Sequence, residues 1–314
     1  MAIADEHPHG SSVVVRRRRG DRLEYLLLHR NVNGADYEGD WAWTSPAGAR
    51  QPGEAVYPAA LRELAEEAGL TALAPWAVDL SARWGVFAVD VEPATTIDLV
   101  VPEHDRYEWL PPAECLRRVL PPSVAAAQIS RTLTIPSMEL SFRRMTHDDL
   151  PAVVRWQQAP HARRWFHDGI TLEDARRRYG PRIDGAAPVR MWVVQMDGID
   201  AGYLQDYIVG DQDDYAKIGD PDAVGFDYLI GDEALVGRRL GTRMVWAFLR
   251  DVVAPHYPAA SRYLASPDHR NIASLRALAK CGFTQGMWID APSRAGAPPT
   301  TEIVCTLDRG HWFG

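Results

Sequence analysis

The chain has 314 residues, of which 46% are hydrophobic and 24% are charged, and its formal net charge is −8 at pH 7. These proportions are ordinary for a globular protein, and the length predicts two domains. No apolar run reaches the roughly 18 residues that a membrane span needs, and the acidic balance disfavours a nucleic-acid partner.

The first ten residues, MAIADEHPHG, lack the basic start and the apolar stretch of a signal peptide. The three cysteines, Cys115, Cys281 and Cys305, have no metal-type spacing, so we expect free thiols. These features predict a cytoplasmic protein with no membrane partner.

In the first half, apolar runs predict strands at residues 11–15 and 23–30. The arginines between them, Arg16 to Arg19, are expected at a solvated hairpin tip. Residues 82–91 and 106–110 are rich in valine and aromatic residues and predict further strands, and residues 121–133 predict a helix that closes the first domain.

A break at Pro136-Ser137, followed by a strand at Glu139–Arg143, predicts two domains over residues 1–137 and 138–314. The second half alternates strands with helices and shows no internal repeat, so we expect two different folds of the mixed α/β class. A hairpin is expected to turn at Asp197-Gly198. Further elements are predicted as a strand at 223–230 and helices at 150–158, 172–180, 238–254 and 271–283.

Acidic residues cluster in a predicted helix between Pro58 and Gly69. Glu63, Glu66 and Glu67 share one helix face, where they repel each other unless a cation lies between them. Mg²⁺ takes oxygen ligands of this kind. Two residues are expected in the preceding loop, Glu54 and Gly48, and a glycine there lets the backbone carbonyl approach an ion.

The spacing of Gly48, Glu54, Arg62-Glu63-Leu64, Glu66-Glu67 and Gly69-Leu70 matches the Nudix box, and this half resembles Nudix hydrolases. The resemblance implies an α/β/α sandwich with a mixed sheet, Mg²⁺ or Mn²⁺ as cofactor, and hydrolysis of a nucleoside-diphosphate derivative. It implies metal binding by Gly48, Glu66 and Glu67, with Glu63 as a further ligand or the base and Arg62 holding a glutamate. The alternative is a non-catalytic docking, dimerisation or ligand-sensing module, which leaves a homodimer open.

In the second half, residues 236–242 lead into a predicted helix whose first amides suit a pyrophosphate, and Gly237 and Gly241 keep this loop unhindered. Asn271 begins another helix, which ends in Cys281-Gly282-Phe283. Taken singly, these features are also typical of an ordinary turn and a helix cap.

Taken together they resemble the GNAT acetyltransferases, with a mixed-sheet α/β fold, and within them the aminoglycoside 6'-N-acetyltransferases. Segments that carry the second resemblance include Arg164–Phe166, Gly202–Tyr207 and Gly225–Asp227. The resemblance implies that Asp227 accepts a proton from the amine and that Gln205, Tyr207 and Trp165 line the acceptor pocket. It implies acetyl-CoA binding by Val236, Gly237, Arg238, Arg239, Gly241, Thr242 and Asn271.

Six aspartates lie between Asp211 and Asp227, and their field favours a cationic acceptor that Asp213 and Asp214 would bind. A solvated acidic loop is the alternative. The chain has Arg239 where the family usually has glycine, and Ser266 where it has a substrate-binding aspartate. Ser266, together with Leu278, keeps a peptide, a polyamine or a nucleotide-peptide antibiotic open as the acceptor.

The family's thiolate-protonating tyrosine is replaced by Leu278, so Tyr228 or Tyr263 would serve, or the thiolate leaves unassisted. His104 and His269 are expected at the surface. Trp41, Trp43 and Trp76 are expected in the core or at its rim, with base stacking as the alternative.

Overall fold

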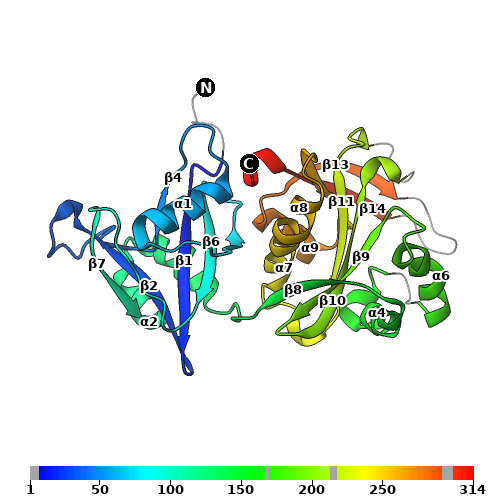
Figure 1. Cartoon of the computed structure of the whole chain (residues 1–314), viewed down its shortest axis with the longest axis horizontal. Coiled ribbons are helices and arrows are strands. Elements are labelled where there is room, and N and C mark those ends of the chain that lie inside the picture. The colour runs from blue at the N-terminus through cyan, green and yellow to red at the C-terminus, as the bar shows by residue number, and fades with distance from the viewer. Residues whose placement is uncertain (1–6, 167–169, 213–217, 292–299) are drawn as a thin grey trace. The chain divides into compact units, whose positions relative to one another are not determined.

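The computed structural model describes residues 7–166, 170–212, 218–291 and 300–314, and the chain divides into two compact units (Figure 1). The first unit comprises Met1–Ser137 with Gly310–Gly314, and the second comprises Met138–Arg309. Each unit combines a seven-stranded mixed sheet with helices, which confirms the predicted mixed α/β class. Over the described ranges, no helix is both long and apolar enough to cross a membrane.

The sheet of the first unit has the order β3-β2-β1-β6-β5, with β4 paired to β1 and β7 paired to β2. The central pair, β1 and β6, is parallel, and the other pairs are antiparallel. Its strands are β1 (Gly10–Arg19), β2 (Arg22–Arg30), β3 (Trp43–Thr44), β4 (Ala47–Ala49), β5 (Trp76–Asp79), β6 (Trp84–Val91) and β7 (His104–Leu110).

The helices of the first unit are α1 (Val56–Ala68), α2 (Pro112–Arg118) and α3 (Pro122–Ala125), and α3 continues into a π-helical turn, Ala126–Ser130. A further short helix, α10 (Arg309–Trp312), leads into the C-terminal segment. The ring of Phe313 in that segment lies 6.1 Å from the ring of Tyr57 at the start of α1.

The expected solvated tip of four arginines is wrong for Arg16, which is fully buried in β1. Its guanidinium donates to both carboxylate oxygens of Asp90 on β6, at 2.8 and 2.9 Å, and to the carbonyls of Thr132 and Ile135. A buried cation is tolerated when a carboxylate and further acceptors satisfy it. The turn itself lies at Gly20, after the exposed Arg18 and Arg19.

The sheet of the second unit has the order β13-β14-β12-β11-β10-β9-β8. The predicted hairpin is confirmed, because β9 and β10 turn at Asp197-Gly198, which have φ of 52° and 75°. Its strands are β8 (Leu140–Arg144), β9 (Arg190–Met196), β10 (Ile199–Ile208), β11 (Val224–Ile230), β12 (Arg262–Ala265), β13 (Thr284–Ala291) and β14 (Thr300–Asp308).

Helices cover both faces of this second sheet (Figure 1). On one face, α4 and α6 enclose a core with Val193, Tyr203 and Tyr207. On the other, Phe248 of α7 packs against Phe142 and Phe226. The helices of this unit are α4 (Leu150–Gln158), α5 (Pro160–Arg163), α6 (Leu172–Ile183), α7 (Leu240–Phe248), α8 (Ala254–His256) and α9 (Ile272–Lys280).

The parallel pair β11 and β12 is short. It consists of the residue pairs Val224–Tyr263 and Gly225–Leu264, after which β11 continues to Ile230 while β12 ends at Ala265. The last five residues of β11 therefore extend beyond this pairing, and Asp227 and Tyr228 lie among them.

Three smaller predictions have different outcomes. The cysteines are free and buried, as expected. The surface placement of His104 is wrong, because this ring is 5% exposed, while His269 is half-buried. Trp43 and Trp76 lie in the core, whereas Trp41 is exposed.

Candidate active sites

Helix α1 carries the glutamate cluster of the first unit. The helix ends at Gly69, whose φ of 66° is left-handed and suits glycine. The amide of Leu70 donates to the carbonyl of Leu64 across this turn. The local sequence thus fixes where the helix ends, and the helix fixes which carboxylates share a face.

Arg62 lies at the centre of this cluster. Its guanidinium donates to both carboxylate oxygens of Glu54, at 2.8 and 3.0 Å. One terminal nitrogen also donates to Glu63 at 2.7 Å and to Glu66 at 2.9 Å. The hydrogen bonds from Arg62 hold the pKa of the Glu54 carboxyl below its usual value. One cation therefore offsets the repulsion among these three carboxylates.

Two of the cluster's carboxylates are withdrawn from water. Burial raises the pKa of Glu67 to about 8, and its carboxylate accepts a hydrogen bond from the amide of Ala47 at 2.9 Å. Burial also raises the pKa of Glu63. Each group would ionise more readily beside a cation.

Gly48 lies in strand β4, which corrects its expected place in a loop, because residues 47–49 pair with β1. A Cβ atom on Gly48 would come within 2.0 Å of a carboxylate oxygen of Glu63. Its carbonyl oxygen would meet a Cβ placed on Gly10, so that oxygen faces β1. The absence of a side chain at Gly48 therefore makes room for Glu63.

The glutamates supply the oxygen donors that Mg²⁺ prefers. In the part of the chain that the structure describes, no group of three or more His, Cys, Asp or Glu side chains is arranged to hold a metal ion. Arg62 binds Glu63 and Glu66, while Glu67 faces the Ala47 amide. The residue types fit a magnesium ion, which would compete with Arg62 for the same carboxylates.

A cavity of about 440 Å³ in the first unit is lined by Arg30, Asn31, Val32, Pro102 and Glu103. Arg30 and Glu103 form an ion pair, and the charges of both affect the pKa of Glu67. The sequence analysis missed these two residues, because neither lies within the motif. Glu103 is a further carboxylate near the buried Glu67.

In the second unit, the loop before α7 has two left-handed residues, Gly237 with φ 79° and Arg239 with φ 62°. Arg239 is the position where glycine was expected, and a left-handed arginine costs roughly 1–2 kcal/mol. No side chain caps the amides of this helix start, and residues 236–239 are exposed. Gly241 and Thr242 follow in the first turn, so these uncapped amides suit an anion.

Asn271 caps helix α9, since its side-chain oxygen accepts from the amide of Ser274 at 3.2 Å. The hydroxyl of Tyr228 lies 2.6 Å from the hydroxyl of Ser274, and burial raises the Tyr228 pKa. Burial also raises the pKa of Tyr263 to about 12. Leu278 is fully buried in this helix.

Asp227 on β11 is joined to its neighbours by a chain of side-chain hydrogen bonds. The amide of Gln205 on β10 donates to the Asp227 carboxylate at 2.6 Å, and Arg182 of α6 donates to the Gln205 carbonyl at 2.5 Å. The two strands bring the first pair together in register. Tyr207 lies two residues further along β10, and its ring crosses Gly225, where a Cβ would lie 2.4 Å from it. Arg182 was missed from the sequence, because its role depends on how α6 packs.

The other predicted acceptor residues divide into two groups. Asp213 and Asp214 lie outside the described residues. Trp165 is half-buried after α5 and stacks under the guanidinium of Arg164, 4.5 Å from its ring centre.

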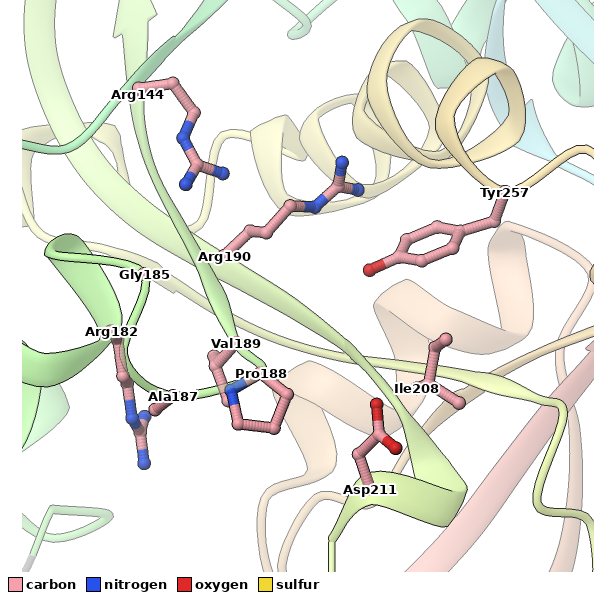
Figure 2. Close-up of a pocket in the computed structure, with 10 residues that line it drawn as sticks. All are labelled: Arg144, Arg182, Gly185, Ala187, Pro188, Val189, Arg190, Ile208, Asp211 and Tyr257. Atoms are coloured by element: carbon pink, nitrogen blue, oxygen red, sulfur yellow. The ribbon is translucent and has the colours of Figure 1, made fainter.

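A second cavity, of about 290 Å³, lies at one end of the second sheet (Figure 2). Three arginines line it, Arg144, Arg182 and Arg190, together with Asp211 and Tyr257. The sequence analysis did not select these arginines, since they come from three separate elements and form no motif.

Comparison with known families agrees with this organisation. Residues 7–129 match the family model described as NUDIX domain, and residues 145–291 match the model described as acetyltransferase (GNAT) domain. A comparison with curated proteins gives no significant match.

Solved structures are similar to the second part of the chain. An aminoglycoside acetyltransferase AAC(6')-Ib in complex with coenzyme A is 23% identical over 55% of this chain and 96% of that chain, with a TM-score of 0.49. An uncharacterised protein from Bacillus halodurans is 20% identical over 56% and 86%, with a TM-score of 0.49. An aminoglycoside N(6')-acetyltransferase from Legionella pneumophila is 20% identical over 55% and 94%, with a TM-score of 0.43.

Proposed function

We propose that the chain joins a Nudix domain to a GNAT acetyltransferase domain, and that the second domain transfers an acetyl group from acetyl-CoA to an amine of a small molecule. We take the boundary between them to lie after residue 137. The observation that carries the proposal is the carboxylate of Asp227, which Gln205 orients at 2.6 Å. Asp227 lies on the part of β11 that extends beyond its pairing with β12.

The coenzyme would bind at the start of α7. The uncapped amides of Gly241 and Thr242 and the exposed cations Arg238 and Arg239 would hold its pyrophosphate. Val236 and Gly237 would complete this loop, and Asn271 is proposed as a further contact. Bound acetyl-CoA supplies an activated acetyl thioester.

Asp227 would take the proton that the attacking amine loses, directly or through a water molecule. Arg182 donates to the Gln205 carbonyl and so fixes the orientation of the Gln205 amide, which donates to Asp227. Tyr228 and Tyr263 are the candidates to protonate the departing thiolate, and burial raises the pKa of both, which makes each hydroxyl a weaker proton donor. A thiol with a pKa of ~8.5 can also leave without this help.

For the acceptor, we propose an aminoglycoside-like cationic molecule, whose acetylation would confer antibiotic resistance. The matching segments Gly202–Tyr207 and Gly225–Asp227 support this, as do the aspartates between Asp211 and Asp227. Gln205, Tyr207 and Trp165, with Asp213 and Asp214, would line the pocket. A peptide, a polyamine or a nucleotide-peptide antibiotic is the alternative.

Mass spectrometry of amine panels incubated with the protein and acetyl-CoA tests this proposal. The expected result is a product heavier by one acetyl group, formed from an aminoglycoside-like amine. Acetylation of only a peptide or a polyamine would overturn the acceptor class, and release of no thiol with any amine would overturn the reaction.

A second function, Mg²⁺-dependent hydrolysis of a nucleoside-diphosphate derivative, is favoured by the carboxylates around Arg62. Glu66 and Glu67 would bind Mg²⁺ or Mn²⁺, which supplies charge neutralisation of the diphosphate. Gly48, expected as a third ligand, would instead leave room for the Glu63 carboxylate, because its own carbonyl faces β1. Glu63 would be a further ligand or the base that takes a proton from water. Arg62 would orient these glutamates.

Replacing Glu66 and Glu67 by glutamine tests the second function. Hydrolysis predicts that this variant no longer splits nucleoside-diphosphate derivatives into a nucleoside monophosphate and the phosphorylated second group. A docking module predicts no such products from the wild type and an unchanged assembly in the variant.

A further inference from the structure

The cavity at the end of the second sheet is positively charged. It lies where β8 ends with Arg144, where β9 begins with Arg190, and beside the last turn of α6 with Arg182 (Figure 2). Asp211 is the one carboxylate in the described lining. Three guanidinium groups and one carboxylate therefore line this cavity of about 290 Å³. A cavity of this volume suits a small ligand group.

Arg190 is held by one ion pair and by stacking, since its guanidinium lies 4.5 Å from the ring centre of Tyr257. Its Nε donates to the buried carboxylate of Asp206 at 2.7 Å, while both terminal nitrogens are buried and have no hydrogen-bond partner in the described structure. Asp206 is already occupied, because it also accepts from Trp192 at 2.6 Å and from Tyr257 at 2.7 Å. Buried donors without a partner are rare in proteins, and a free guanidinium edge suits a carboxylate or a phosphate.

Arg144 brings a second cation to the same place. Its guanidinium lies 4.9 Å from the ring centre of Trp192, and that of Arg190 lies 5.6 Å from the same ring. Figure 2 shows the guanidinium groups of Arg144 and Arg190 in the upper part of the view, while the side chain of Arg182 points the other way. Burial and the nearby Arg190 charge lower the pKa of Arg144. An anion between these two groups would offset their repulsion.

Arg182 connects the cavity to the proposed proton acceptor. It donates to Gln205 at 2.5 Å, and Gln205 donates to Asp227 at 2.6 Å. One residue of the cavity lining is thus joined through Gln205 to the acceptor site.

We propose that this cavity binds a carboxylate or phosphate group of the acetyl acceptor, held by Arg144 and Arg190. The inference rests on the proposed acetyl transfer and favours one of its alternative acceptors over an aminoglycoside, which carries no oxyanion. The acceptor would be a small molecule that carries both an amine and an oxyanion. A nucleotide-peptide antibiotic or a short peptide fulfils this condition, whereas a polyamine does not.

Binding of inorganic phosphate to the full chain tests the cavity without any acetyl transfer. Isothermal titration at constant ionic strength would compare the wild type with R144Q and R190Q. R190Q also removes a hydrogen-bond partner of Asp206. R144Q changes an exposed side chain, so it is the main variant. The exposed Arg155 of α4 lies outside the lining, so R155Q is the matched control.

We expect phosphate affinity to fall at least tenfold in R144Q and to stay at the wild-type value in R155Q. No phosphate binding by the wild type, or equal binding by R144Q, overturns the proposal. These outcomes do not depend on whether the protein acetylates amines.

Kinetics with matched amines test the assignment to the acceptor. Phosphoethanolamine is compared with ethanolamine, and lysine with cadaverine, while thiol release from acetyl-CoA is followed. The expected result is a lower KM for the member with the oxyanion, and competition by inorganic phosphate against the acceptor in the wild type. If phosphate binds at Arg144 but does not compete with an accepted amine, the acceptor assignment is wrong. If no amine releases thiol, the proposed function fails, and the phosphate titration still decides the cavity.

Discussion

In the Nudix unit, the guanidinium of Arg62 donates to Glu54, Glu63 and Glu66, whereas the terminal nitrogens of Arg190 in the acetyltransferase unit have no partner in the described structure. The two side chains are similarly buried, with exposures of 21% and 16%. Burial therefore does not separate an arginine that holds its own chain together from one that is available to a ligand. The two kinds of arginine differ instead in whether their terminal nitrogens already have hydrogen-bond partners.

The largest effect is expected at Asp227, because its carboxylate is proposed to accept a proton and not to hold the fold together. D227N should lower kcat/KM for acetyl transfer about 100- to 1,000-fold, because the amide cannot take the amine's proton. Thiol release measures this. D222N, an exposed change in the same acidic stretch, is the control and should keep the wild-type rate. Equal rates for D227N and the wild type would remove Asp227 from the mechanism.

A second test compares the two kinds of arginine directly. R62Q should lower the stability of the Nudix unit by about 2 kcal/mol, because it leaves the buried Glu63 beside Glu66 without its cation. R144Q should leave stability unchanged or raise it, since it removes repulsion with Arg190. Urea unfolding followed by hydrogen exchange in each unit measures both. Equal losses in the two variants would contradict the distinction.

His104 provides a pH test of a buried group that the comparison does not involve. Burial lowers its pKa from 6.5 to about 4. The unfolded chain therefore takes up a proton first as the pH falls, so stability is lost between pH 6.5 and 4. At pH 5 this loss is roughly 2 kcal/mol relative to pH 7.

Melting temperatures of the wild type and H104L at pH 7 and pH 5 check this effect. The variant should lose less stability than the wild type over this interval. H256L, at an exposed histidine, should behave as the wild type does. An identical pH response of H104L and the wild type would show that His104 is not the responsible group.

The smallest effect is expected at Gly48. A Cβ there would come within 2.0 Å of Glu63, whose flexible end can move aside, so G48A should cost only about 1 kcal/mol. Moving the Glu63 carboxylate should lower the affinity for Mg²⁺ by more than it lowers the stability of the fold. Titration with Mg²⁺ would show this. The control is G180A in α6, where the nearest atom to an added Cβ lies at 3.5 Å. Unchanged Mg²⁺ affinity in G48A would show that Glu63 is not a ligand of the metal.

The difference between the two sites also explains how much the sequence could predict. The glutamates of α1 share a face because of their spacing in a single helix, and the helix end at Gly69 is a local signal. Most strands and helices of both units follow from such local patterns. Their positions in the two sheets do not.

Long-range pairing explains what the sequence missed. Arg16 looked solvated because its partner Asp90 lies 74 residues away on β6. Arg182 reaches Gln205 only because α6 packs on the sheet, and Arg144 and Arg190 meet because β8 and β9 are neighbours. Arg239 shows the reverse case, since its position was recognised but its left-handed backbone was not.

The most direct test of the account is acetyl transfer by the wild type and D227N to amines with and without an oxyanion, followed by mass spectrometry. The account predicts that the wild type adds one acetyl group, prefers phosphoethanolamine over ethanolamine, and loses this activity in D227N. An acetylated product formed equally by D227N, with no preference between the two amines, would contradict it.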